Sequence, residues 1–382
     1  MFGDKTGDHS LLTYFIVGVL IIFVSFCNRL LLPQRRAAVR KTSNRVLVVS
    51  VPEPSSGERK DIAYVAVGAI LILFAGARFG TGSDYFLYLA LYEAVDTSSL
   101  TNAIENSPQS VGFAALMFFL KSATEFPYVL FGVASALTVV PVLIAIKRRS
   151  ADPAFALFVY FFLGYYAVSF NAVRQSIAVS FLLLADTYRD ESKVKYLLLS
   201  LLAVAIHSSA ILLILFQLII KFWNPTYRSV LAVFAMTIPL SFLVLNSGAL
   251  SFVSSLLNAR YETYLQGSED GAGFGTVLLL ISKIFFIFFA LSLPKTNDSS
   301  RYIAFLCLSA IFVYLGFFTW VIARLETYFG IFLILLLPNQ LDAWKHGGIS
   351  KLIIACAMLV YFALYVSNYN GLVPYVFLPE WE

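Results

Sequence analysis

The sequence contains few charged residues, few histidines and few cysteines. Only 13% of its 382 residues are Asp, Glu, Lys or Arg, whereas a soluble domain carries about 25%. Cys27, Cys307 and Cys356 all lie in apolar runs, so we expect buried hydrophobic side chains and neither disulfides nor metal ligands. Because there are only three histidines, no metal or other cofactor is predicted. The net charge of +5 does not indicate a nucleic-acid partner, because most basic residues flank apolar runs.

Apolar residues, in contrast, are abundant and come in long blocks. They make up 59% of the chain, the mean hydropathy is +0.82, and several blocks reach the roughly 20 residues that a helix needs to cross a bilayer. Unbroken runs of this kind do not alternate as the strands of a membrane barrel do. The first run, 11–32, follows Asp4 and Asp8, which predicts a permanent helix rather than a cleaved signal peptide. The sequence therefore predicts one polytopic all-α membrane domain over residues 1–382.

About twelve transmembrane helices are expected from these runs. They are residues 11–32, 61–79, 126–146, 153–170, 172–188, 194–207, 208–222, 229–246, 274–294, 301–321, 324–341 and 350–368. The loop at 33–60 is rich in Lys and Arg and is therefore expected in the cytoplasm. The polar segments at 80–125 and 247–273 then lie on the opposite, outer side.

The basic block Lys147-Arg148-Arg149 constrains this topology. It is cytoplasmic only if the apolar segment 109–122 does not cross the membrane, so we expect an amphipathic helix on the outer surface there. The later basic residues are cytoplasmic only if 194–222 crosses twice, with a break at His207-Ser208-Ser209. The alternative is one long tilted helix, which would place the later basic loops outside.

Seven of the 27 Lys and Arg residues do not fall on the cytoplasmic side in this topology. They are Lys5, Arg78, Lys121, Arg174, Arg260, Lys283 and Arg324. Arg78, Arg174 and Arg324 each end an apolar helix at the outer face, where membrane insertion disfavours a charge, and this marks them as candidate functional residues. Arginine grips phosphate with a planar fork of donors, so several together would bind a diphosphate and stabilise its charge as it leaves. Alternatively, each one anchors its helix at the membrane surface.

Four further residues are candidates for proton transfer or charge pairing. His207 follows an apolar run and could take a proton from an attacking sugar hydroxyl, or it could be a structural residue at a helix break. Asp84 and Glu326 are alternative bases, although each could instead pair with an arginine. Lys283 lies within an apolar helix and either lines a cavity or pairs with an acid.

Four short motifs, taken in order, resemble the pattern of the EpsG/Wzy-type polysaccharide polymerase family. They are Arg78-Phe-Gly-Thr-Gly-Ser-Asp-Tyr with Tyr88, Asn171-Ala-Val-Arg-Gln-Ser-Ile-Ala178, His207-Ser-Ser-Ala210, and Arg324 with Tyr328-Phe and Pro338. The resemblance covers about residues 60 to 340. It implies a glycosyltransferase of the bacterial inner (cytoplasmic) membrane with a multi-helix GT-C-like fold. Such an enzyme joins undecaprenyl-diphosphate-linked repeat units at the periplasmic face during O-antigen, capsule or exopolysaccharide assembly.

The resemblance also implies a set of site residues and partners. The family's polar pattern falls on Arg78, Asp84, Tyr88, Asn171, Arg174, Gln175, His207, Arg324 and Tyr328. From this pattern and the residue arguments above, the catalytic candidates are His207, Asp84, Arg174 and Arg324. The substrate-binding candidates are Arg78, Tyr88, Asn171, Gln175 and Tyr328, together with Arg260, which the resemblance does not include. Arg260 lies in the second outer loop, which could close over the substrate. The expected partners are a lipid-linked glycan donor and acceptor, membrane lipids and a chain-length regulator protein. The 33–60 loop has no assigned role.

Two other functions remain open from the sequence. A flippase for the same lipid-linked sugar would need charges at several depths in the membrane, whereas the assigned charges cluster at one face, with Lys283 as the main exception. A ligase that moves a finished chain to another acceptor would use similar arginines, so composition does not distinguish it from a polymerase.

Overall fold

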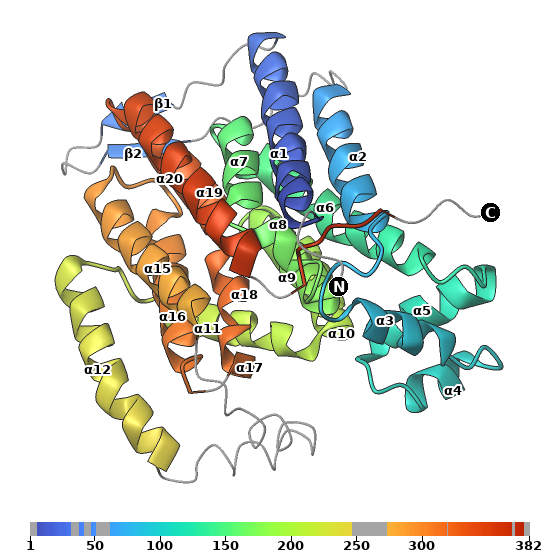
Figure 1. The fold of residues 1–382 in the computed structure, drawn as a ribbon. Helices are drawn as coiled ribbons and strands as arrows, with labels where there is room; N and C mark the ends of the chain where they lie inside the picture. The colour runs from blue at the N-terminus through green and yellow to red at the C-terminus, as the bar shows by residue number, and fades with distance from the viewer. Residues whose placement is uncertain are drawn as a thin grey trace.

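The computed structural model describes residues 6–31, 38–41, 47–50, 62–246, 273–318, 320–368 and 371–377. Apart from one short antiparallel hairpin, β1 (Ala38–Lys41) and β2 (Leu47–Ser50), the regular structure in these ranges is helical. Most of the helices pack as one bundle, and α3, α4 and α5 gather beside it at the lower right of Figure 1. The predicted loop 247–273, including Arg260, lies almost entirely outside the described residues.

Most of the helices follow the predicted apolar runs in order, and α3 and α4 do not. The helices are α1 (Thr6–Leu31), α2 (Ile62–Gly76), α3 (Tyr85–Glu93), α4 (Leu100–Glu105), α5 (Val111–Ala123), α6 (Val129–Arg149), α7 (Pro153–Phe162), α8 (Tyr165–Val168), α9 (Val173–Thr187), α10 (Lys193–Ile206), η1 (Ser208–Ala210), α11 (Ile211–Ile220), α12 (Tyr227–Asn246), α15 (Phe274–Ser292), α16 (Ser299–Leu315), α17 (Trp320–Ala323), α18 (Glu326–Gly330), α19 (Leu333–Ala343) and α20 (Gly347–Asn368). By length and composition, α6, α15 and α20 could each cross a membrane, and the described residues contain seven shorter apolar helices. The helical class is confirmed and the apolar helices are compatible with a membrane protein, while the twelve spans and the GT-C-like fold stay predictions.

Aromatic side chains fill the centre of the bundle. Tyr14 of α1 meets the edge of the Phe74 ring at 5.3 Å between centroids, and Phe74 stacks on Tyr375 at 4.3 Å. Helices approach closely where one of them carries glycine. A Cβ atom on Gly18 of α1 would lie 2.5 Å from the ring of Phe162 in α7. Helices in lipid associate through such close packing rather than through the hydrophobic effect.

Two expected spans and one expected polar stretch differ from the observed helices. The expected helix 153–170 is broken at Gly164, which takes a left-handed φ of +82° that glycine tolerates best. The expected helix 324–341 is divided into α18 and α19, with Arg324 in the turn before α18. The expected polar stretch 80–108 contains α3 and α4. The sequence signal for α3 is the i, i+3, i+7 spacing of Tyr85, Tyr88 and Tyr92, all of which are buried.

The predicted break at residues 207–209 is confirmed. α10 ends at Ile206, His207 is extended with φ −148° and ψ 110°, and α11 runs back alongside α10. The Tyr196 hydroxyl of α10 donates a hydrogen bond of 2.5 Å to Gln217 Oε1 of α11. Since residues 21 positions apart are paired across the break, the segment is an antiparallel hairpin and not one long helix.

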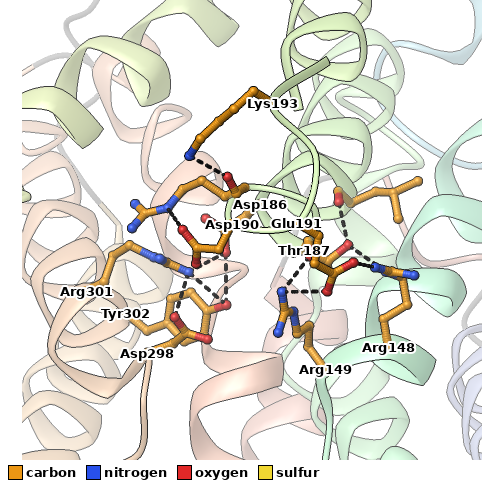
Figure 2. A network of polar contacts seen from close by, with 12 residues as sticks. Arg148, Arg149, Asp186, Thr187, Asp190, Glu191, Lys193, Asp298, Arg301 and Tyr302 are labelled. Carbon is orange, nitrogen blue, oxygen red and sulfur yellow. Dashed lines mark hydrogen bonds and ion pairs between the residues drawn. The ribbon is translucent and has the colours of Figure 1, made fainter. Parts of the chain in front are cut away.

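Segments that the sequence assigns to the cytoplasm meet at one end of the bundle. Figure 2 shows two neighbouring groups there. In the first, Arg148 and Arg149 at the end of α6 pair with Glu191. In the second, Arg301 of α16 lies 2.8 Å from the buried Asp186 Oδ2 of α9, which also accepts a hydrogen bond from Tyr302. The structure therefore groups these segments as predicted, while the membrane side that they face stays a prediction.

The ion pair of Asp186 predicts that this carboxylate contributes more to stability than the neighbouring Asp190. Asp186→Ala removes the buried carboxylate that accepts from Arg301 and Tyr302, while Asp298 stays 3.0 Å from Arg301, and we expect it to lower the free energy of unfolding by roughly 1–3 kcal/mol. Asp190→Ala is the matched control, because that side chain is 66% exposed and its ion pair with Arg189 is long, at 3.7 Å. It should lower the free energy of unfolding by less than about 0.5 kcal/mol. Thermal melting of the detergent-solubilised proteins compares the two. Equal melting temperatures for both variants would contradict the assignment.

Candidate functional site

The four motifs meet at the end of the bundle opposite the Asp186 network. The backbone N–H of Ser83 donates to Asn171 Oδ1 at 2.8 Å, which joins the first motif to the second. The Gln175 side chain of α9 donates to the carbonyl oxygen of Arg324, which joins the second motif to the fourth. Residues far apart in the sequence thus lie close together at this end of the bundle.

The third motif joins the fourth through a pair of hydroxyl groups. Ser209 Oγ lies 3.1 Å from the Tyr328 hydroxyl. Tyr328 is fully buried, and its ring belongs to the core of the bundle. The His207–Ser208–Ser209 break is therefore held against α18, two residues beyond Glu326.

Arg78 lies just beyond the end of α2 and is 2% exposed. Its Nε donates to the carbonyl of Thr81 at 3.1 Å, its Nη2 to the carbonyl of Phe170 at 3.3 Å, and its Nη1 to the carbonyl of Ala75. The guanidinium carbon also lies 4.7 Å from the ring centroid of Phe131. A cavity beside it measures about 10 Å³, which holds at most one water molecule. Arg78 therefore binds backbone carbonyls at the end of α2, in the following turn and before the second motif, and its predicted contact with substrate stays a prediction.

Two other segments of the chain pack closely against the Gly80–Gly82 turn, one at Phe170 and Asn171 and one at 371–377. Gly82 has a φ of +103°, its N–H donates to the carbonyl of Gly371 at 2.6 Å, and a Cβ atom there would strike Phe170 and Asn171. The chain end also packs on this turn, because the Phe79 N–H donates to the carbonyl of Val376 at 2.8 Å. The sequence reasoning missed this contribution of residues 371–377, since no motif marks them.

Asp84 and Tyr88 are placed differently from each other. Asp84 is partly exposed at the start of α3, where it accepts a hydrogen bond of 3.2 Å from the Ser83 hydroxyl. Tyr88 is 5% exposed, and its ring meets the edge of Phe113 of α5 at 5.9 Å. The guanidinium carbon of Arg174 lies 5.9 Å from the centroid of the same Phe113 ring. Tyr88 therefore packs against the same Phe113 ring as Arg174, whereas Asp84 lies at the surface.

His207, Arg174 and Arg324 form the polar part of the site. His207 lies between α10 and η1, and burial, followed by the positive charges of Arg174 and Arg324, lowers its pKa to about 4. Its Nδ1 atom and the Nε atom of Arg174 are buried and bond to no residue in the described part of the chain. Arg324 is exposed. At neutral pH the site thus combines an uncharged imidazole with two guanidinium groups, an arrangement suited to an anion next to a proton acceptor.

Lys283 is paired with Glu326, an acid that the sequence reasoning could not identify as its partner. Its Nζ lies 2.9 Å from Glu326 Oε2. Because this pairing engages Glu326, it leaves His207 and Asp84 as the candidate bases. Arg260 falls outside the described residues, and within those residues no group of three or more His, Cys, Asp or Glu side chains gathers as a metal site.

These features define the class of the protein as a helical membrane protein with a polar, arginine-containing site at one end of its bundle. Residues 61–377 match the family model described as the EpsG family. The chain belongs to the EpsG family, which associates it with a polysaccharide-polymerase-like role in polysaccharide biosynthesis. No curated protein and no solved structure gives a significant match.

The lowered pKa of His207 predicts a measurable pH dependence of stability. The unfolded chain has an ordinary histidine pKa near 6.5, so it takes up a proton as the pH falls below about 6.5, whereas the folded state does not until about pH 4. The free energy of unfolding should therefore fall across this window, by roughly 3 kcal/mol from this residue. Thermal melting between pH 7 and pH 4 should show a weaker pH dependence for His207→Gln than for the wild type. If His207→Gln showed the same pH dependence of the melting temperature as the wild type, the lowered pKa of His207 would be contradicted.

Proposed function

We propose that this protein is a glycosyltransferase that polymerises undecaprenyl-diphosphate-linked oligosaccharide repeat units. A growing chain on its lipid diphosphate is the donor, and one lipid-linked unit is the acceptor. The observation that carries the proposal is that the segments bearing Arg174, His207 and Arg324 are joined at one place, by the Gln175 contact with the Arg324 carbonyl and the Ser209 contact with Tyr328. Membership of the EpsG family supports the same reaction class.

Arg174 and Arg324 hold the leaving group in this proposal. The reaction breaks the bond between the donor's anomeric carbon and the diphosphate oxygen, and negative charge develops on that oxygen. Guanidinium groups fixed beforehand in a site with little water stabilise this charge strongly. Arg174 suits the task because its Nε is buried and bonds to no described residue, and Arg324 suits it because it is exposed to an incoming ligand.

His207 takes the proton of the acceptor hydroxyl as that oxygen attacks the anomeric carbon. A base must be uncharged before the step, and a pKa of about 4 leaves His207 uncharged at neutral pH. Binding of a diphosphate between the arginines cancels part of their charge, which raises the proton affinity of the imidazole when substrate is present. Asp84 is the alternative base at the edge of the site.

The remaining predicted residues have supporting parts in this proposal. Gln175 fixes the backbone of Arg324, Asn171 fixes the Ser83 turn, and Arg78 ties that turn to the end of α2. Tyr88 packs against Phe113, whose ring Arg174 also contacts, and the Tyr328 hydroxyl contacts Ser209 in the break after α10. Arg260 and its loop are proposed to close over the bound sugars.

The location follows from the charge distribution of the chain. The basic 33–60 loop and the basic ends of α6 and α16 favour the cytoplasmic side for the Asp186 end, so the site opens to the periplasm. We assign the enzyme to the bacterial inner membrane, with a GT-C-like arrangement of about twelve spans. Membrane lipids surround it, and a chain-length regulator is a candidate protein partner. A flippase is less well supported, because Lys283, the main charge within a helix, is paired with Glu326.

The direct test is to incubate the purified protein with defined lipid-linked repeat units. Glycans of two or more units on one lipid are the expected product, separated by size on a gel. A product in which the glycan is transferred to a different acceptor would instead indicate a ligase. Movement of the lipid-linked unit across vesicles without extension would indicate a flippase.

Replacing either arginine should abolish extension. Arg174→Ala and Arg324→Ala should each lower kcat by about 10²–10³-fold, the usual cost of removing one preorganised donor, and cells should accumulate single repeat units without long chains. Arg228→Ala is the matched control, because Arg228 is exposed on α12 near the opposite end of the bundle. Long chains at normal protein levels in both site variants would refute the proposed role.

A further inference from the structure

A buried ion pair lies beneath the Arg324 turn. Lys283 is the tenth of the 19 residues of α15, so it lies in the middle of that helix, far from either end. Its side chain is 3% exposed and that of Glu326 is 8% exposed, and their Nζ and Oε2 atoms are 2.9 Å apart. A charge within an apolar helix is costly and therefore points to a function.

The pair is satisfied by groups from two further helices. The Lys283 ammonium also donates to the Tyr165 hydroxyl at 2.9 Å, and that hydroxyl donates to the carbonyl of Gly330 at 2.6 Å. The Ser309 hydroxyl of α16 donates to Glu326 Oε2 at 2.9 Å. One carboxylate and one ammonium thus join α8, α15, α16 and α18.

This network holds the segment 324–330, which carries two site residues. Glu326 begins α18, Arg324 precedes it by two residues, and Tyr328 follows it by two. On the opposite side, Gln175 of α9 donates to the carbonyl of Arg324. The turn that presents Arg324 is therefore held from α9 on one side and from α15 on the other.

Stability alone does not explain the pair. Removing two charges from water costs about as much as their attraction returns, and well-packed apolar side chains often serve as well or better. An ion pair does impose a defined geometry, because each oxygen and each N–H has a fixed partner. Reaction rates depend steeply on such geometry, since a displacement of about 1 Å can cost about 100-fold in rate.

We infer that Lys283 and Glu326, with Tyr165, are positioning residues that set the location of Arg324 and Tyr328 in the site. This inference rests on the proposed function, because it assigns the pair a task in the same reaction. The pair touches no substrate and transfers no proton. It fixes the α18 turn so that the Arg324 guanidinium meets the departing diphosphate.

Gly330→Ala tests the inference without removing any member of the network. A Cβ atom there would lie 2.5 Å from Lys283 Nζ, 2.7 Å from Glu326 Oε2 and 2.9 Å from Ser309 Oγ, so the pair must shift. We expect kcat to fall at least about tenfold, with KM for the lipid-linked acceptor within about twofold of the wild type. Gly275→Ala is the matched control on α15, since a Cβ atom there meets nothing within 4 Å, and it should leave both constants unchanged.

Tyr165→Phe provides a second variant that adds no atom. It removes the hydroxyl between Lys283 and the carbonyl of Gly330, and we expect kcat to fall several-fold at a nearly unchanged melting temperature. A wild-type kcat in either folded variant would overturn the inference. Loss of the melting transition in both variants would assign the network to stability alone, and would overturn it as well.

Hydrogen exchange separates this inference from the proposed function. The amides of residues 322–330 should exchange faster in Gly330→Ala than in Gly275→Ala, whether or not the protein extends glycans. If the wild type extends no lipid-linked glycan, the proposed function fails, while the exchange experiment still tests the positioning. If the wild type extends glycans and Gly330→Ala matches it in kcat and in exchange, only the positioning fails.

Discussion

The site depends on how the ends of broken helices are satisfied inside an apolar bundle. Carbonyl groups at the end of a helix have no partner within it, and leaving them unpaired in an apolar interior is costly. Arg78 resolves this at the meeting point of two helix ends, because its guanidinium binds carbonyls of Ala75 and Phe170 and of the intervening turn at Thr81. The same contacts fix the turn beside Asn171 and, through the start of α9, the location of Arg174.

The other broken helices reach the same place by different means. The hairpin of α10 and α11 brings His207 to the site, and the division between α17 and α18 places Arg324 in an exposed turn. Each break is held by a side chain from another helix, Tyr328 in the first case and Gln175 in the second. Irregular backbone within a membrane protein is tolerated where protein surrounds it, and here it supplies the polar groups of the proposed reaction.

The sequence predicted the helical membrane class, the break at residues 207–209 and the family, because apolar runs and short motifs are local patterns. It placed Arg78 among the substrate-binding residues, which stays a prediction, and it did not reveal the three backbone carbonyls that the guanidinium binds, because the contact with the Phe170 carbonyl joins segments 92 positions apart. It expected one helix over 153–170, since the run is apolar throughout and a single glycine does not reveal its φ. It did not join Lys283 to Glu326, because their contact crosses 43 positions of sequence and no periodic pattern records it.

The central claim is that a lipid-linked diphosphate is held between Arg174 and Arg324 beside His207. The most direct measurement is a structure of the protein in a lipid nanodisc with a lipid diphosphate that lacks a transferable sugar. The account predicts phosphate oxygens within hydrogen-bonding distance of both guanidinium groups, with the imidazole facing the position of the missing sugar. Phosphate density at the Asp186 end of the bundle, or contact with neither arginine, would contradict it.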